Sequence, residues 1–514
     1  MASTLPFSFG GPGDLRSIGI LLHPTALPGS PVCGGFGAGA RQWLDLLAKH
    51  GVGVWQVLPL APTDATGSPY SSPSSFAINP WLLDAQDLLD EGYLLETAFK
   101  TLPGQTQAVR DSRRLDCELA DRRAQAIAKA LHDAWPHQDA CRREAFQAWC
   151  ASQRFWLDDH ARFVALRRQH QGLPWWRWPQ PLARHDRQAM RDWSSRHSDD
   201  LEQERLLQWH LDRQWQALRS RAEKRGVCLF GDLPFYVATD SADVWSHRRL
   251  FSIQRDGTLN TQSGVPPDYF SDTGQLWGTP VYRWWMHRLT RFRWWRARLR
   301  RQWTLFDLLR LDHFRALAAY WAVPGDDRTA AQGVWQPSPG HALLRCLKAD
   351  SGGHLPLVAE DLGVVTPDVE ALRDQFALPG MKILQFAFDG NPDNPYLPEN
   401  IRGDRWVVYT GTHDNPTSLG WWRGLDGASR ARMESLVGQS IEAPGWQLLE
   451  LGLASTARLV VTPIQDLLHL DDQARFNTPG TVQDNWVWRL SALDQSVDDA
   501  LRGYGERASV WGRR

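Results

Sequence analysis

Three carboxylates in this chain each follow a short apolar run. Asp312 ends the stretch LFDLLRLD, Glu360 follows LPLVA, and Asp414 ends WVVYTGTHD. Two carboxyl groups about 5 Å apart can cleave a glycosidic bond with retention, one as the nucleophile and the other as the acid and then the base. Because neighbouring strands lie about 4.8 Å apart, adjacent strand ends can supply that separation. The residue types therefore predict chemistry on a sugar acetal.

The neighbours of these carboxylates favour different protonation states. Arg310 and Asp312 lie two residues apart, so on a strand they face the same side, and the positive charge would hold a nucleophile ionised. Glu360 follows three apolar residues, and an apolar setting raises the pKa of a carboxyl group, as an acid requires. His413 and Asp414 could bind secondary hydroxyls of a sugar and favour ring distortion. Taken singly, each motif is as readily a structural salt bridge or a loop hydrogen bond.

The elements that must position these residues recur along the whole chain. Near-continuous apolar runs are typical of parallel strands that are covered on both faces. Eight such runs, separated by helical patterns, are expected to be strands: 18–23, 52–59, 227–232, 305–312, 355–361, 382–388, 406–414 and 459–466. Eight parallel strands with helices between them predict an α/β fold, a (β/α)8 TIM barrel with its site at the carboxyl ends of the strands.

Two long connections predict insertions around that site, within a single catalytic barrel domain that spans 1–514. The segment at about 85–222 is rich in Arg, Gln and Trp with helical spacing, and we expect a helical subdomain there. The segment at about 240–300 carries GVPPDYFSDTGQLWGTP, which is rich in turn formers, and we expect a lid or binding wall.

Composition narrows the classes of partner and location. The chain has 57 basic and 58 acidic residues, so no global field favours nucleic acid or an anionic membrane. No basic leader with an apolar core and no run of about 18 apolar residues occurs, which predicts a cytoplasmic protein. Six cysteines without C-x-x-C spacing argue against both a disulfide framework and a zinc site.

Other motifs are weaker. GGFGAG at 34–39 begins too far after the first predicted strand for a dinucleotide loop, and no Walker A, HExxH or GxSxG sequence occurs. Tryptophan is abundant, with 28 residues and clusters at 174–182 and 282–289. Flat indole rings suit the apolar faces of sugars. For any single tryptophan, packing in the core is an equally good interpretation.

Long motifs in a fixed order make the chain resemble the amylomaltases, the 4-α-glucanotransferase or disproportionating-enzyme family, which is related to the α-amylases. The resemblance runs from about residue 18 to 490. It is carried by GILLHPTALPG, WQVLPLAPT, GSPYSSPSSFAINP, GDLPFYVATDSADVW, PPDYFSDTGQLWGTPVY, RLDHFR, AEDLG, GTHDN and RFNTPGT.

The resemblance implies roles for individual residues. Asp312 would be the nucleophile, Glu360 the general acid and base, and Asp414 the stabiliser of the distorted transition state. Residues that match positions around the sugar at the cleavage point are Ser68, Tyr70, Asp232, Arg310, His313, His413 and Asn477. Residues that match the loop covering the acceptor side are Asp268, Tyr269, Phe270 and Trp277. No metal or organic cofactor is implied.

Small departures from the family pattern leave the catalytic groups in place. Ala316 stands where the family usually has Gly, and Pro416 replaces a common acidic residue. The segment APTDATGSPY lacks a tyrosine often found before SPY, which puts a secondary glucan-guiding contact in doubt.

The expected activity is transfer of α-1,4-glucan segments from a maltodextrin donor to the 4-hydroxyl of an acceptor glucan or glucose. The expected partners are α-1,4-glucans, with no nucleic acid, membrane or obligate protein partner. Two alternatives stay open on the residues alone: an α-amylase-like hydrolase with the same carboxylates, and a non-catalytic Trp-rich glucan-binding protein. The second predicts the loss of one or more of Asp312, Glu360 and Asp414, and all three are present.

Overall fold

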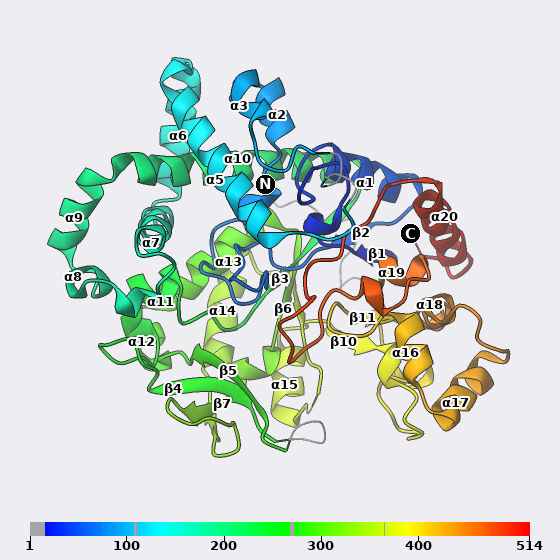
Figure 1. Cartoon of the computed structure of the whole chain (residues 1–514). Coiled ribbons are helices and arrows are strands. Elements are labelled where there is room, and N and C mark those ends of the chain that lie inside the picture. Colours follow the sequence, from blue (N-terminus) through cyan, green and yellow to red (C-terminus); the bar gives the residue numbers. More distant parts are fainter. Residues whose placement is uncertain (1–15, 107–108, 110–111, 268–271, 364, 514) are drawn as a thin grey trace.

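The computed structural model shows eight short parallel strands surrounded by helices, with further helices and a second sheet at one side (Figure 1). It describes residues 16–106, 109, 112–267, 272–363, 365–513. In the described part of the chain, no helix combines the length and apolar character needed to cross a membrane.

Each of the eight predicted runs overlaps one barrel strand. The strands are β1 (Ser17–Leu21), β2 (Val54–Gln56), β3 (Cys228–Leu233), β6 (Leu308–Leu311), β9 (Leu357–Ala359), β10 (Gly380–Ile383), β11 (Trp406–Tyr409) and β12 (Leu459–Pro463). They pair in the order β10-β11-β12-β1-β2-β3-β6-β9, and every pairing in this sheet is parallel. Nearly all of their residues are buried, as expected of strands covered on both faces. The (β/α)8 barrel prediction is confirmed.

The gap between β9 and β10 is closed by contacts outside the regular ladder. The Ala359 N–H donates to the Pro379 carbonyl at 2.8 Å, and the Met381 N–H donates to the Asp361 carboxylate at 2.8 Å. A side chain at Gly380 would lie 2.5 Å from that same carboxylate. Glycine therefore leaves the space through which Asp361 joins the two edges and brings the strand ends into one ring.

Two predicted strands end earlier than the apolar runs suggested. The run 382–388 is strand only as far as Ile383 and continues as a 3-10 helix, and the run 406–414 is strand only to Tyr409. His413 and Asp414 therefore lie in a turn beyond β11. Asn415 shapes this turn, because its side-chain oxygen accepts from the Thr412 N–H at 2.9 Å.

Helices cover the outside of the barrel and connect its strands. Those packed around it are α1 (Ala38–Lys49), α10 (Ser198–Lys224), α13 (Arg293–Leu305), α14 (Gly340–Asp350), α15 (Pro367–Gln375), α18 (Pro444–Ala454) and α20 (Gln495–Val510). Smaller helices lie in the connections: α11 (Ala242–Ser246), α12 (Trp284–Leu289), α16 (Ser418–Gly424), α17 (Gly427–Val437) and α19 (Ile464–Leu467).

From α2 onward, the segment between β2 and β3 is mostly helical, and it extends away from the barrel (Figure 1). Before α10 it contains α2 (Ala85–Asp90), α3 (Glu96–Lys100), α5 (Cys117–Ala134), α6 (Ala140–Ser152), α7 (Leu157–Gln169), α8 (Gln180–Ala183) and α9 (Arg187–Arg196). Helix α10 buries Leu207, Leu211 and Trp215 along one face, and the chain leaves it through Gly226 at φ +70°. It joins the helical segment to the barrel wall.

A four-stranded antiparallel sheet stands beside the barrel mouth. Its strands are β4 (Thr261–Val265), β5 (Gln275–Pro280), β7 (Ala319–Pro324) and β8 (Val334–Pro337), in the order β5-β4-β7-β8. Two of these strands precede β6 and two follow it. The sequence analysis predicted a loop-rich wall at about 240–300, where β4 and β5 lie, because short strands rich in Gly and polar residues lack an apolar signature. It made no prediction for β7 and β8.

Most tryptophans of the two clusters pack in the core. Trp175, Trp178 and Trp284 are buried, and Trp285 is largely exposed. Where these side chains are buried, core packing is the correct interpretation and sugar binding is wrong.

Candidate active site

Strand register brings Arg310 and Asp232 face to face. The two residues are direct partners in the β3–β6 pairing, and the Arg310 guanidinium binds both carboxylate oxygens of Asp232 at 2.9 and 2.8 Å. A second nitrogen of Arg310 lies 2.8 Å from the Asp312 carboxylate. Arg310 and Asp232 are buried, whereas the Asp312 side chain is 30% exposed. One buried cation thus holds two carboxylates, of which one faces the open mouth.

Glu360 lies next to Asp312 on the adjoining strand end. Leu311 pairs with Ala359 in the β6–β9 register, so the residues that follow them, Asp312 and Glu360, stand side by side. The Glu360 N–H donates to the Leu311 carbonyl at 3.1 Å, which continues the ladder to this point. The spacing of parallel strands, about 4.8 Å, is close to the separation that retaining glycoside chemistry requires.

The surroundings of Glu360 favour the protonated, uncharged form of its carboxyl group. The pKa of its carboxyl is raised to about 7, mainly by burial and also by the nearby Asp312, against the opposing effects of Arg310 and two backbone N–H donors. Those donors are the N–H groups of His313, at 2.8 Å, and Leu362, at 3.0 Å. A carboxyl group with this pKa can both give and take a proton near neutral pH.

Asp414 lies across the mouth, in the turn after β11. Its carboxylate accepts from the Asn477 amide at 2.6 Å and lies 3.3 Å from the His413 ring nitrogen, with 45% of its side chain exposed. Arg475 ties the two segments together, because its guanidinium donates to the carbonyls of Asp414 and Asn477 at 2.6 and 2.7 Å. The carboxylate is therefore fixed by Asn477 and His413 on one side and accessible from the barrel mouth on the other.

Tyr70 connects the part of the site around Asp232 with the part around His413 and Asp414. Its hydroxyl donates to Asp232 at 2.8 Å, and its ring stacks on His413 with centroids 5.1 Å apart and planes at 10°. The Ser68 hydroxyl accepts from the Tyr70 N–H at 3.3 Å and so orients the backbone of the tyrosine. Tyr70 and His413 thus link Asp232 to Asp414 through a pair of stacked rings.

His313 and Trp277 lie on the side of the second sheet. The Trp277 indole packs edge-on against the His313 ring at 4.8 Å, and Tyr236 lies beside both. Burial lowers the pKa of His313 to about 4, so the ring is neutral, and its buried Nε2 has no hydrogen-bond partner in the described part of the chain. Such a nitrogen can bond to a ligand hydroxyl.

The sequence-predicted site residues within the described ranges gather at this mouth. Those brought together are Ser68, Tyr70, Asp232, Arg310, Asp312, His313, Glu360, His413, Asp414, Asn477 and Trp277. Asp268, Tyr269 and Phe270 fall outside the described residues.

Sequence reasoning missed three residues that hold the site. Trp486 packs on Tyr70 and His413, with ring centroids 5.7 and 6.0 Å away, and adopts a left-handed backbone at φ +66°. Tyr236 and Arg475 are the other two. Both stand inside motifs already quoted, GDLPFY and RFNTPGT, so the motif itself was the available signal. Trp486 lies beyond those motifs and had no such signal.

No cluster of three or more His, Cys, Asp or Glu side chains suited to a metal ion occurs among the residues with described positions. At the mouth itself, the positive charge beside Asp232 and Asp312 is the guanidinium of Arg310. The chemistry available is that of paired carboxyl groups.

Comparison with known proteins gives matches that share one family description. The family model described as 4-alpha-glucanotransferase matches residues 22–495. A 4-alpha-glucanotransferase of Thermus thermophilus is 44% identical over 496 residues, covering 95% of this chain and 97% of that protein. A 4-alpha-glucanotransferase of Synechocystis sp. is 41% identical over 505 residues, covering 98% of this chain and 99% of that protein.

A solved structure shares the whole architecture. The amylomaltase from Streptococcus agalactiae in complex with acarbose superposes with a TM-score of 0.91 at 31% identity, covering 97% of this chain and 99% of that chain. The similarity therefore extends over the barrel and over both segments inserted into it.

Proposed function

The chain belongs to the 4-alpha-glucanotransferase family, and we propose on that basis that Asp312, Glu360 and Asp414 transfer α-1,4-glucan segments by a retaining double displacement. The observation that carries the assignment is the β6–β9 register, which puts an Arg310-bound carboxylate beside a carboxyl group with a pKa of about 7. That difference separates a nucleophile from an acid.

In the first step the Asp312 carboxylate attacks the anomeric carbon of the donor glucan. Glu360 gives its proton to the glycosidic oxygen, the bond between C1 and that oxygen breaks, and a glucosyl ester of Asp312 forms. In the second step Glu360 takes the proton from the 4-hydroxyl of an acceptor, whose oxygen attacks C1 and releases Asp312. Two inversions leave the new bond in the α configuration.

Asp414 and His413 bind the secondary hydroxyls of the sugar at the cleavage point in this proposal. The open face of Asp414 and its support by Asn477 suit a carboxylate whose hydrogen bonds strengthen as the ring flattens. Tyr70 offers an aromatic face, and the free Nε2 of His313 offers a polar contact on the opposite side.

Transfer requires that a sugar hydroxyl reach the intermediate before water does. Trp277 and Tyr236, on the side of the second sheet, supply aromatic surface where the acceptor would enter. Ordering the acceptor and excluding water both favour transfer. We assign the segment 240–300 to this acceptor wall and the helical segment 85–222 to an insertion, within one catalytic domain.

The substrates in this proposal are maltodextrins as donors, with maltodextrins, maltose or glucose as acceptors. A cytoplasmic location and the absence of a protein partner stay predictions. Incubation of the purified protein with maltotriose tests the function. Longer maltodextrins and free glucose at a constant number of reducing ends are expected. A rise in reducing ends with only shorter products would identify a hydrolase, and no reaction would leave a glucan-binding protein.

A further inference from the structure

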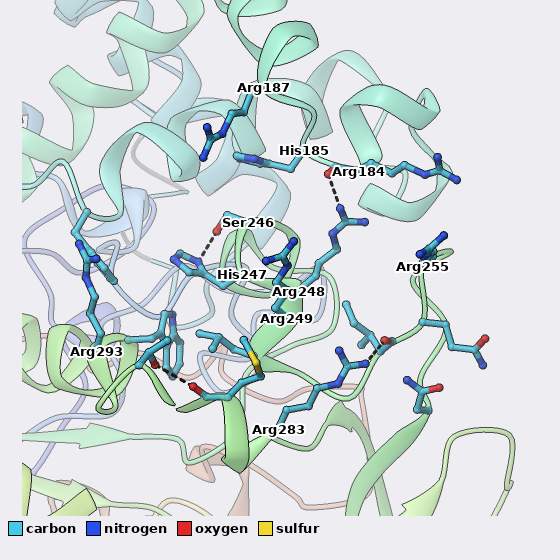
Figure 2. A pocket seen from close by; sticks show the side chains of 18 residues that line it. Arg184, His185, Arg187, Ser246, His247, Arg248, Arg249, Arg255, Arg283 and Arg293 are labelled. Atoms are coloured by element: carbon cyan, nitrogen blue, oxygen red, sulfur yellow. Dashed lines mark hydrogen bonds between the residues drawn. The ribbon is translucent and has the colours of Figure 1, made fainter. Parts of the chain in front are cut away.

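A large cavity lies away from the carboxylates. It has a volume of about 1440 Å³ and is bounded by helices α8 and α9, by the segment 246–255, and by helices α12 and α13 (Figure 2). None of the residues assigned to the barrel mouth lines it. The reaction proposed above leaves this cavity without a role.

Arginine dominates the lining. Seven arginines and two histidines are among the lining residues, with no aspartate or glutamate: Arg184, Arg187, Arg248, Arg249, Arg255, Arg283, Arg293, His185 and His247. Five of the arginines are exposed to solvent, and Arg248 and Arg283 are partly buried. In Figure 2, Arg187 reaches from one wall toward His247, and Arg249 points upward from the opposite wall. The charges come from segments far apart in sequence and converge only in the folded chain.

These arginines are not paired with carboxylates. Within the described ranges, none of the seven makes an ion pair with an acidic side chain, although the chain has many such pairs elsewhere. Arg248 and Arg283 donate to backbone carbonyls, of Arg184 and Ile253 respectively. Burial, and to a smaller extent the nearby Arg184, lowers the pKa of Arg248.

Three acidic residues close to the lining already have hydrogen-bond partners. Asp186 accepts from the N–H groups of Gln188 and Ala189, both at 3.0 Å, and so begins helix α9. Asp256 accepts from the Thr258 N–H and hydroxyl at 3.1 and 2.7 Å. Asp159 contacts the lining through His185, at 3.0 Å, and also accepts from Arg162 at 3.0 Å. Within the described ranges, none of these three carboxylates pairs with any of the seven guanidinium groups.

We propose that this cavity binds a small molecule carrying two or more phosphate groups. A guanidinium presents two parallel N–H groups that match a phosphate or carboxylate edge, and unpaired arginines on facing walls can engage several such edges at once. Seven arginines carry more positive charge than a ligand with a single carboxylate could neutralise. The net charge of −1 and the concave shape favour a small ligand over a nucleic acid.

The test uses the full chain with Arg187, Arg249 and Arg255 replaced together by Gln. None of these three makes a side-chain hydrogen bond in the described structure, so their loss removes charge and spares internal contacts. The matched control replaces Arg122, Arg345 and Arg402, three exposed arginines outside the cavity, by Gln. Both triple variants lose the same charge. Maltotriose transfer and Tm measured without ligand establish that each variant is folded.

Isothermal titration at about 0.15 M salt with inorganic tripolyphosphate, a nucleoside triphosphate and a hexose bisphosphate measures binding. We expect all three to bind the parent chain and the control, and the R187Q/R249Q/R255Q variant to bind at least tenfold more weakly. Equal affinity for the three ligands would assign recognition to phosphate alone, and tighter binding of one organic ligand would assign part of it to the sugar or base.

Three results would overturn the proposal. They are no binding of any of the three ligands, an equal loss in the control variant, and binding of neutral maltoheptaose that the cavity variant loses. Where the triple variant does not fold, the single variants R187Q, R249Q and R255Q replace it, each with a smaller expected loss in the same direction. Because transfer without ligand is a separate readout, failure here is distinguishable from failure of the proposed transfer reaction.

Discussion

The barrel mouth and the arginine-lined cavity handle charge in opposite ways. At the mouth, one buried guanidinium, that of Arg310, is surrounded by the carboxylates of Asp232 and Asp312, and each charge has a partner within 3 Å. In the cavity, seven arginines are among the lining residues, with no aspartate or glutamate. The charges at the mouth are balanced without a ligand, whereas those of the cavity are not.

The difference matches what each region has to do. A neutral glucan brings no charge, so the site that cleaves it must fix its own ionisation states through internal partners. In a region with unbalanced charge, repulsion lowers the free energy of unfolding, and this loss is offset only when a counter-ion or ligand binds. Arginine at the mouth is thus a structural partner, and arginine in the cavity is a ligand-facing group.

The largest expected effect comes from the charge that faces the substrate. Replacing Asp312 by Asn removes the nucleophile and should lower kcat for maltotriose disproportionation by about 10⁴-fold or more. Maltodextrin binding, measured by titration calorimetry, should stay within severalfold of the parent, because Arg310 keeps Asp232 as a partner. A rate within tenfold of the parent would remove Asp312 from the mechanism.

Glu360 should show the next largest effect and a distinct pH dependence. With a pKa of about 7, it must be protonated for the first step, so kcat/KM should fall roughly tenfold per pH unit above about pH 7. Glu360→Gln should lower the rate by about 10²- to 10⁴-fold, and the residual activity should lose that alkaline fall. A variant that keeps the same alkaline limb would place the titrating acid elsewhere.

Replacing Arg310, the buried cation at the mouth, tests whether the stability of the protein depends on the ion pairs there. Arg310→Met leaves the buried Asp232 without its partner and should lower the free energy of unfolding by about 3–5 kcal/mol, measured by urea titration. Arg310→Lys keeps the charge without the two-pronged contact and should fall between the parent and Met. Equal stability of all three proteins would contradict the pairing argument.

The same kind of substitution in the cavity should have the opposite sign and a small size. Arg249→Gln removes one of several like charges and should raise Tm by about 1 °C at low salt, because repulsion falls. The gain should vanish in about 0.5 M salt, where such interactions are screened. A decrease in Tm that salt does not change would show that Arg249 stabilises the fold through contacts, and the contrast between the two regions would then fail.

Much of the fold and the core of the site could be predicted from local sequence. Apolar runs such as Leu357–Ala359 identify buried parallel strands, since only such strands are apolar on both faces. Asp312 and Glu360 stand directly after their strands, so their position at the mouth followed from the fold. Asp414 was placed there as well, although its strand ends five residues earlier at Tyr409, because the following turn returns to the same edge.

Features that depend on contacts between distant segments could not be predicted in this way. The sequence does not specify strand register, so the direct pairing of Asp232 with Arg310 and the side-by-side placement of Asp312 and Glu360 came only from the structure. The packing of Trp486 on Tyr70 joins residues 416 positions apart and had no local signal.

The sequence by itself determined the class of fold, the chemical identity of the carboxyl groups that we propose as catalytic, and the family motifs that surround them. Those properties reside in residue types and in spacings of a few residues, which the backbone periodicity of strands converts into faces. Only the tertiary structure decided which charges are paired. Arg310 and Arg249 are the same residue type, and their environments differ because Arg310 lies on a barrel strand opposite a carboxylate, whereas Arg249 lines a cavity with no aspartate or glutamate among its lining residues.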